Sequence, residues 1–296
     1  TRLQGDWSSD VCSSDLGNPE TLGFISSPEL VVAMAFSGSM KFNPLKDSLK
    51  DKNGNDFKFD PPSGNVLPEN GYSSKDSGYE EPTKTGEVII NPTSERLAFL
   101  QPFPKQDPIT DYKDLPLLIK AQGKCTTDHI SQAGPWLKFR GHLDNISNNM
   151  FLGATNAFTG GTGTGNHPVS NEKDIEINKI ARSLKDDGNG WVAVGDENIG
   201  EGSSREHAAM EPRHMGGLAF IAKSYARIFE ANLKKQGVLA LTFLNKDDFK
   251  KIQEKDKITI SGLDALTPGV SLTIKIKHEE GNSDEISVGH TLNEQE

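Results

Sequence analysis

Apolar and polar positions alternate in two different ways along the last two thirds of the chain. Short apolar runs bounded by turn residues predict buried strands, and stretches with apolar positions three or four apart predict helices. The expected strands are residues 115–121, 191–195, 216–222, 238–243, 257–261, 271–278 and 285–290. The expected helices are residues 204–215, 226–236 and 247–254. In the first part of this region the predicted strands alternate with helices, and the last three predicted strands follow one another directly. We therefore expect an α/β domain that ends in antiparallel strands.

The N-terminal third has a different pattern. Residues 27–40 predict a helix with Ser27 as its N-cap and Pro28 at its first position. From residue 46 to residue 92 no apolar period survives and Pro, Gly, Ser and Asp cluster, which is typical of an interdomain linker. Residues 1–16 have neither helical nor strand periodicity and resemble a translated sequencing adapter, so we treat them as a non-native artefact.

Composition narrows the classes of function. The chain has 296 residues, 34% of them hydrophobic, and a net charge of −10 at pH 7. It can bury a core, but it lacks the basic surplus typical of nucleic-acid binding and any apolar run long enough to span a membrane. The two cysteines, Cys12 and Cys125, provide neither a disulfide framework nor a local thiolate site, and we expect no metal ligand in this chain.

The loop G-E-G-S-S-R-E-H at residues 200–207 is the strongest candidate for chemistry. It follows a predicted strand and opens a predicted helix, where backbone N–H groups favour an anion. Ser203 and Ser204 offer donors or, if one is deprotonated, a base, and Arg205 suits bidentate carboxylate recognition. A purely structural interpretation is equally compatible with the local sequence: Ser203-x-x-Glu206 is a capping box. The loop lacks the third glycine of a dinucleotide fingerprint, which excludes that class of site.

A second candidate pair is Asp128 and Arg140. They lie twelve residues apart after a predicted strand, and for two isolated charged residues a simple ion pair is the simpler interpretation. The neighbouring His129 is expected to be a packed or hydrogen-bonded histidine.

Three long blocks of the chain carry further motifs in a fixed order. Residues 123–131 and 133–149 read G-K-C-T-T-D-H-I-S and A-G-P-W-L-K-F-R-G-H-L-D-N-I-S-N-N. Residues 195–214 read G-D-E-N-I-G-E-G-S-S-R-E-H-A-A-M-E-P-R-H, and residues 222–237 read A-K-S-Y-A-R-I-F-E-A-N-L-K-K-Q-G. Together these blocks resemble the aconitases, in particular the mitochondrial type. The match runs from about residue 17 to the C-terminus, with a poor interval at residues 158–180.

The resemblance implies a domain organisation and a fold class. Residues 17–45 would be the tail of the cluster-bearing region, residues 46–92 the linker, and residues 93–296 the swivel domain, shortened at its C-terminal end. The implied fold class is α/β: an aconitase-like C-terminal swivel domain of mixed layered β/α architecture.

The resemblance also implies an activity. Aconitases are hydro-lyases that isomerise citrate to isocitrate through cis-aconitate. By their positions in the matching motifs, Ser203 would be the catalytic base, and Arg140, Ser204, Arg205 and Asp128 would bind substrate. The family's [4Fe–4S] cluster would belong to the parent enzyme, because its ligand cysteines are not in this chain, and the isolated chain is therefore expected to be inactive.

The expected partners and location follow from the same resemblance. The chain would bind a tricarboxylate substrate, citrate or isocitrate, together with missing N-terminal aconitase domains, and the complete enzyme would be a monomer in the mitochondrial matrix. No membrane or nucleic-acid partner is expected. Two alternatives stay open: homoaconitase or another hydro-lyase of the superfamily, and a non-catalytic swivel-like module that only binds a carboxylate.

Overall fold

A computed structural model describes residues 26–61, 71, 78–82, 86–102, 110–170, 172–203 and 205–295. These residues fall into two compact units, one within residues 22–89 and one within residues 90–296. The domain boundaries expected at residues 17, 46 and 93 stay predictions. Within the described ranges, no helix combines the length and apolar character needed to cross a membrane.

The smaller unit begins with helix α1, Pro28–Ser37. The Ser27 hydroxyl accepts a hydrogen bond from the Leu30 N–H, as the predicted N-cap requires. The helix is three residues shorter than expected because Gly38 adopts a left-handed conformation, with φ of +65°, and caps the C-terminal end.

A short hairpin follows α1 inside the stretch expected to be a linker. Strands β1, Leu49–Lys50, and β2, Asp56–Phe57, pair antiparallel. The ring of Phe59 lies 6.0 Å from that of Phe36 and 5.1 Å from that of Phe57. Aromatic contacts therefore join the hairpin to the helix. The hairpin was not predicted, because this stretch has no apolar periodicity.

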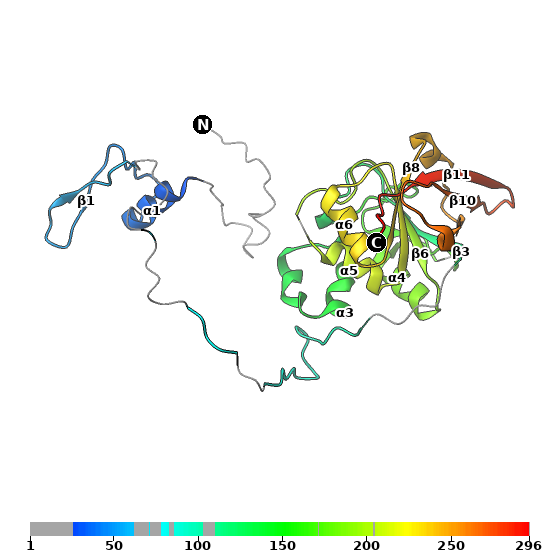
Figure 1. Ribbon diagram of the computed structural model, residues 1–296, viewed down its shortest axis with the longest axis horizontal. Helices are drawn as coiled ribbons and strands as arrows, with labels where there is room; N and C mark the ends of the chain where they lie inside the picture. Colours follow the sequence, from blue (N-terminus) through cyan, green and yellow to red (C-terminus); the bar gives the residue numbers. More distant parts are fainter. Residues whose placement is uncertain are drawn as a thin grey trace. The chain divides into compact units, whose positions relative to one another are not determined.

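The larger unit is built on a closed seven-stranded barrel (Figure 1). Four strands run parallel in the order β3, β6, β7, β8, and three antiparallel strands in the order β11, β10, β9 close the sheet back onto β3. The strands are β3 Asp111–Lys120, β6 Trp191–Gly195, β7 Gly217–Ala222, β8 Leu239–Phe243, β9 Lys257–Ser261, β10 Leu272–Lys277 and β11 Ser283–Gly289. All seven expected strands are present, and the mixed α/β architecture agrees with the expected fold class. The closure of the sheet was not predicted.

Both faces of the parallel strands are buried, which explains their continuous apolar runs. Val192 and Val194 pack with residues of β9, β10 and β11 inside the barrel. Trp191, Ala193 and Phe220 point the other way, against the helices. The helices on that side are α4 Ile177–Asp186, α5 His207–His214 and α6 Arg227–Lys235.

Helical segments agree less well with the sequence than the strands do. Helix α4 was not expected, although Ile177, Ile180, Ala181 and Leu184 form a buried apolar stripe at helical spacing. The helix expected at residues 247–254 is the 3-10 helix η4, Lys246–Lys251. The remaining short elements are α2 Thr127–Ile130, η2 Gly134–Phe139, α3 Leu143–Ile146, η3 Ser147–Asn149, β4 Thr164–Gly165, β5 Ile175–Glu176 and η5 Leu263–Ala265.

A buried histidine joins the antiparallel strands. The His278 ring follows β10, and its Nδ1 lies 2.7 Å from Asp256 Oδ1 while its Nε2 lies 3.2 Å from Asp284 Oδ2. Both ring nitrogens can donate only when the ring is protonated. The hydrogen bond to Asp256 raises the pKa of His278 above its usual value, burial opposes the rise, and Asp284 adds to it.

We expect this contact to make stability depend on pH. Because the folded-state pKa of His278 is raised, its stabilising effect is fully present below about pH 6.5, the unfolded value, and is lost as pH rises through the folded value. His278→Gln should cost about 2 kcal/mol of unfolding free energy at pH 6 and less at pH 9, measured by urea denaturation.

His167→Gln is the matched control, because the buried ring of His167 accepts N–H groups from Val169 and Ser170 rather than facing two carboxylates. Its cost should not shrink as pH rises. A cost of His278→Gln that is equal at pH 6 and pH 9 would contradict the assignment of a protonated ring.

Candidate functional site

The loops that follow β3 and β6 lie side by side at the carboxyl ends of these parallel strands. The Gly200 N–H donates to the Cys125 carbonyl at 2.7 Å, and the Thr127 N–H donates to the Glu201 carbonyl at 3.0 Å. The Gly123 N–H donates to Asp196 Oδ2 at 3.0 Å. Hydrogen bonds therefore join the two candidate segments, which are about 75 residues apart in the sequence, into one structure.

Gly200, which lies where the two loops are joined, packs closely against α6. Its φ is +79°, and a Cβ atom there would lie 2.2–2.4 Å from three atoms of the Phe229 side chain on α6. A side chain at this position would therefore meet both a strained backbone and a fully packed ring. The glycine is required by close approach as well as by conformation.

Asp128 and Arg205 form an ion pair across the two loops. The Arg205 Nη1 also donates to the Ser131 carbonyl at 3.2 Å, and Asp128 Oδ1 accepts the Ala133 N–H at 3.0 Å. The Arg205 side chain is 13% exposed and that of Asp128 is 45% exposed, so the pair sits at the surface with the cation turned inward. The interpretation of Asp128 and Arg140 as a simple ion pair was therefore wrong, because the fold brings Arg205 to the Asp128 carboxylate.

Arg140 reaches the same region through its backbone. It ends η2, its side chain is exposed, and its carbonyl oxygen lies 3.0 Å from Nε2 of His207, the first residue of α5. The structure thus places Arg140 next to the start of the helix that Arg205 precedes.

Ser203 lies four residues before α5 rather than at its start. Its carbonyl accepts the Arg205 N–H at 2.8 Å, and Glu206 occupies the N-cap position without a side-chain cap. The interpretation of Ser203-x-x-Glu206 as a capping box is therefore wrong. The helix expected at residues 204–215 begins three residues later than expected, at His207. Ser204 lies outside the described residues.

A capping box that was not predicted from the sequence lies nearby, at the start of α2. The Thr126 hydroxyl accepts the His129 N–H at 3.2 Å, and His129 Nδ1 accepts the Thr126 N–H at 3.3 Å. It fixes the single turn of α2 that presents Asp128. His129 is the hydrogen-bonded histidine that the sequence predicted.

Two polar residues below the ion pair were missed by sequence reasoning. The Ser131 hydroxyl donates to Glu211 Oε1 at 2.7 Å, and the Glu211 side chain is completely buried. Burial raises the pKa of Glu211 well above its usual range, and the bond from Ser131 only partly opposes this. No motif marked Glu211, since a glutamate in a helix is ordinarily taken as solvent-facing.

A further ionic cluster holds α3 against the neighbouring helices. Asp144 lies 2.9 Å from both Arg182 Nη1 and His214 Nε2. Burial tends to raise the pKa of Asp144, but the bonds from Arg182 and His214 outweigh it and bring the pKa to about 2. Because burial lowers the pKa of His214, we take Arg182 as the cation and His214 as a neutral donor.

The described residues do not fit an iron–sulfur cluster. Cys125 is 1% exposed, and burial raises the pKa of its thiol to about 12. Such a thiol is a poor thiolate ligand. Nowhere in the described ranges do three or more His, Cys, Asp or Glu side chains gather in a way that could hold a metal ion.

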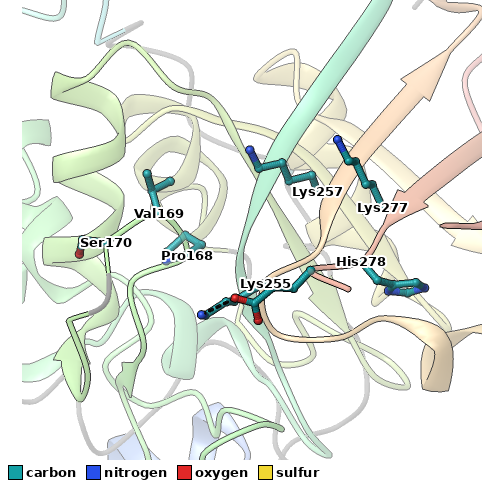
Figure 2. A pocket seen from close by; sticks show the side chains of 8 residues that line it. Pro168, Val169, Ser170, Lys255, Lys257, Lys277 and His278 are labelled. Carbon is teal, nitrogen blue, oxygen red and sulfur yellow. Dashed lines mark hydrogen bonds and ion pairs between the residues drawn. The ribbon is translucent and has the colours of Figure 1, made fainter. Parts of the chain in front are cut away.

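Two cavities lie elsewhere, on the outer face of the antiparallel strands. The larger, of about 340 Å³, is lined by Pro168, Val169, Ser170, Lys255, Lys257, Lys277, His278 and Glu279 (Figure 2). The Lys255–Glu279 ion pair, at 2.7 Å, lies within it. The second, of about 310 Å³, also includes Lys277. Neither cavity contains a residue of the loops that carry Asp128 and Arg205, so the candidate site is defined by those loops.

Comparison with known proteins gives a consistent result. Residues 115–246 match the family model described as the aconitase C-terminal domain. The mitochondrial aconitate hydratase of Gracilaria gracilis is 52% identical over 283 residues, which are 95% of this chain and 36% of that protein. The mitochondrial aconitate hydratase of Saccharomyces cerevisiae is 48% identical over 297 residues, which cover 99% of this chain and 38% of that protein.

The chain thus spans little more than a third of the length of these relatives. The probable mitochondrial aconitate hydratase of Caenorhabditis elegans is similar, with 51% identity over 94% of this chain and 36% of that protein. Among solved structures, a 3-isopropylmalate dehydratase from Methanocaldococcus jannaschii aligns with a TM-score of 0.39 and 22% identity, over 62% of this chain and 85% of that one.

We expect Gly200→Ala to disturb the paired loops. A left-handed alanine costs about 1 kcal/mol, and overpacking against Phe229 adds about 1–3 kcal/mol. Gly188→Ala is the matched control, because its φ of +75° is similar but nothing lies within 4 Å of a Cβ there. Thermal or urea unfolding should show a larger loss of stability for Gly200→Ala than for Gly188→Ala. Equal losses of stability would show that the Phe229 side chain moves aside without an energetic cost.

Proposed function

The chain is homologous to mitochondrial aconitate hydratases and contains an aconitase C-terminal domain, and on this premise we propose that it is the C-terminal part of an aconitate hydratase that isomerises citrate to isocitrate through cis-aconitate. The observation that carries this proposal is the Asp128–Arg205 pair beside Ser203, on loops that hydrogen bonds join. The pair presents an oriented guanidinium, which suits a carboxylate of the substrate.

The reaction requires removal of a weakly acidic proton from a carbon next to a carboxylate. We assign this step to Ser203, which takes the proton in one direction and returns it in the other. An ordinary serine hydroxyl is too weak a base, so its deprotonated form needs nearby positive charge. Arg205, two residues away and bonded to the Ser203 carbonyl through its backbone N–H, is the cation closest in sequence.

Substrate binding is assigned to four residues. Arg205, held by Asp128, would contact one carboxylate, and Arg140, whose side chain is exposed near the start of α5, would contact another. Ser204 would add a hydroxyl donor. In a chain of net charge −10, binding of a tricarboxylate needs a local concentration of positive charge, which Arg140 and Arg205 would supply.

The [4Fe–4S] cluster of the proposed parent enzyme is not held by the residues described here. The only described cysteine is the buried Cys125, and no group of metal ligands forms around it. Acceptance of the leaving hydroxyl is therefore assigned to the rest of the parent enzyme. N-terminal aconitase domains are the proposed partners of this chain, and the complete enzyme is proposed to act as a monomer. Because the relatives named above are mitochondrial proteins, we place the parent in the mitochondrial matrix.

We expect this chain alone to have no measurable isomerase activity, and the full-length product of its transcript to interconvert citrate, cis-aconitate and isocitrate. Absorbance of cis-aconitate follows the reaction. Parallel assays with homocitrate and isopropylmalate test the sister hydro-lyases, and a preference for either would replace the proposed substrate. Binding of tricarboxylates without turnover would favour the non-catalytic module.

In the full-length enzyme, Ser203→Ala should lower kcat by about 10²–10⁴-fold, because it removes the proposed base. Because Ser203 is not the cap of α5, the variant should not lose a helix cap, and urea unfolding checks that it remains folded. Ser261→Ala, on the exposed end of β9, is the control and should keep wild-type turnover. Ser203→Ala with unchanged kcat would remove Ser203 from the mechanism.

A further inference from the structure

Helix α5 carries a polar stripe on one face. His207, Glu211 and His214 are spaced four and three residues apart, so their side chains lie above one another. Each contacts the segment from residue 127 to residue 146: His207 Nε2 lies 3.0 Å from the Arg140 carbonyl, Glu211 Oε1 accepts from the Ser131 hydroxyl at 2.7 Å, and His214 Nε2 lies 2.9 Å from Asp144. The stripe therefore holds the segment that bears Asp128 and Arg140.

Glu211 differs from the two histidines in burial. Its side chain has no exposed surface, and its Oε2 has no hydrogen-bond partner among the described residues. A buried carboxylate with a single neutral donor is costly, because most of its hydration is not replaced. Burial accordingly favours the neutral acid, in agreement with the raised pKa of Glu211.

Ser131 links Glu211 to the ion pair. Its hydroxyl donates to Glu211, and its backbone carbonyl accepts from Arg205 Nη1 at 3.2 Å. Ser131 is 2% exposed and ends the short helix α2 that presents Asp128. The hydrogen bond to Glu211 therefore fixes Ser131, whose carbonyl supports Arg205.

We propose that Glu211 is a positioning residue, which as a neutral acid clamps Ser131 and thereby fixes the guanidinium of Arg205 for carboxylate binding. The proposal rests on the proposed function for the role of Arg205, but the contact itself lies wholly within this chain. A neutral clamp has a physical advantage over a charged one. A carboxylate at Glu211 would compete with Asp128 for the guanidinium and would repel an anionic substrate, whereas the neutral acid holds Ser131 without doing either.

The test compares three variants by the NMR signal of the Arg205 side-chain Nε–H in this chain. Glu211→Gln keeps the shape and an acceptor for Ser131, so the Arg205 shift and its slow solvent exchange should stay those of the wild type. Glu211→Leu removes the acceptor, and Ser131→Ala removes the donor. Both should shift the signal and speed its exchange at least tenfold.

Two controls keep the result decisive. His214→Gln lies on the same stripe but contacts Asp144, so it should leave the Arg205 signal unchanged. The double variant Glu211→Leu/Ser131→Ala should be no worse than either single variant, because both act through one bond. If Glu211→Leu does not fold, Ser131→Ala decides alone. A folded Glu211→Leu or Ser131→Ala with the wild-type Arg205 signal would overturn the proposal.

The consequence for catalysis is measured in the full-length enzyme. Glu211→Leu should raise KM for isocitrate at least tenfold with a smaller change in kcat, and Glu211→Gln should rescue KM. A purely structural role predicts equal losses for Gln and Leu, which would overturn the positioning role. A full-length wild type without hydro-lyase activity would contradict the proposed function only, because the Arg205 signal in this chain still tests the clamp.

Discussion

The candidate site depends on the parallel pairing of β3 with β6 and of β6 with β7. Parallel strands end at the same edge of a sheet, so the segments that follow them are brought together whatever their separation in sequence. Backbone hydrogen bonds between Gly200 and Cys125 and between Thr127 and Glu201 then fix how the two loops lie. Without that pairing, Asp128 and Arg205 would be two unrelated charged residues.

Burial and ion pairing together determine which side chains near the site carry a charge. The protein is acidic overall, yet Arg205 is turned inward onto the Asp128 carboxylate, and burial raises the pKa of the nearby Glu211 well above its usual range. Asp144 is satisfied separately by Arg182. A neutral Glu211 adds no negative charge next to the guanidinium of Arg205, which suits a site for negatively charged ligands.

Local motifs predicted strands well and helix ends poorly, and both outcomes have a physical cause. An apolar run such as that of β6 is buried on both faces, so packing reinforces the local preference. Ser203-x-x-Glu206 has the composition of a cap, but tertiary hydrogen bonds to the loop after β3 hold the preceding residues Gly200 and Glu201, and the helix starts only at His207. Helix α4 was missed although its apolar stripe was present in the sequence.

The sequence by itself determined the strand set, the α/β class and the resemblance that singles out Asp128, Arg140, Ser203, Ser204 and Arg205, because periodicity and motif order are properties of the chain. Only the tertiary structure decided that the sheet closes into a barrel, that Asp128 pairs with Arg205 rather than Arg140, and that Glu211 is buried beneath them. These features arise between residues far apart in sequence. Their energies depend on burial and on partners that no local pattern encodes.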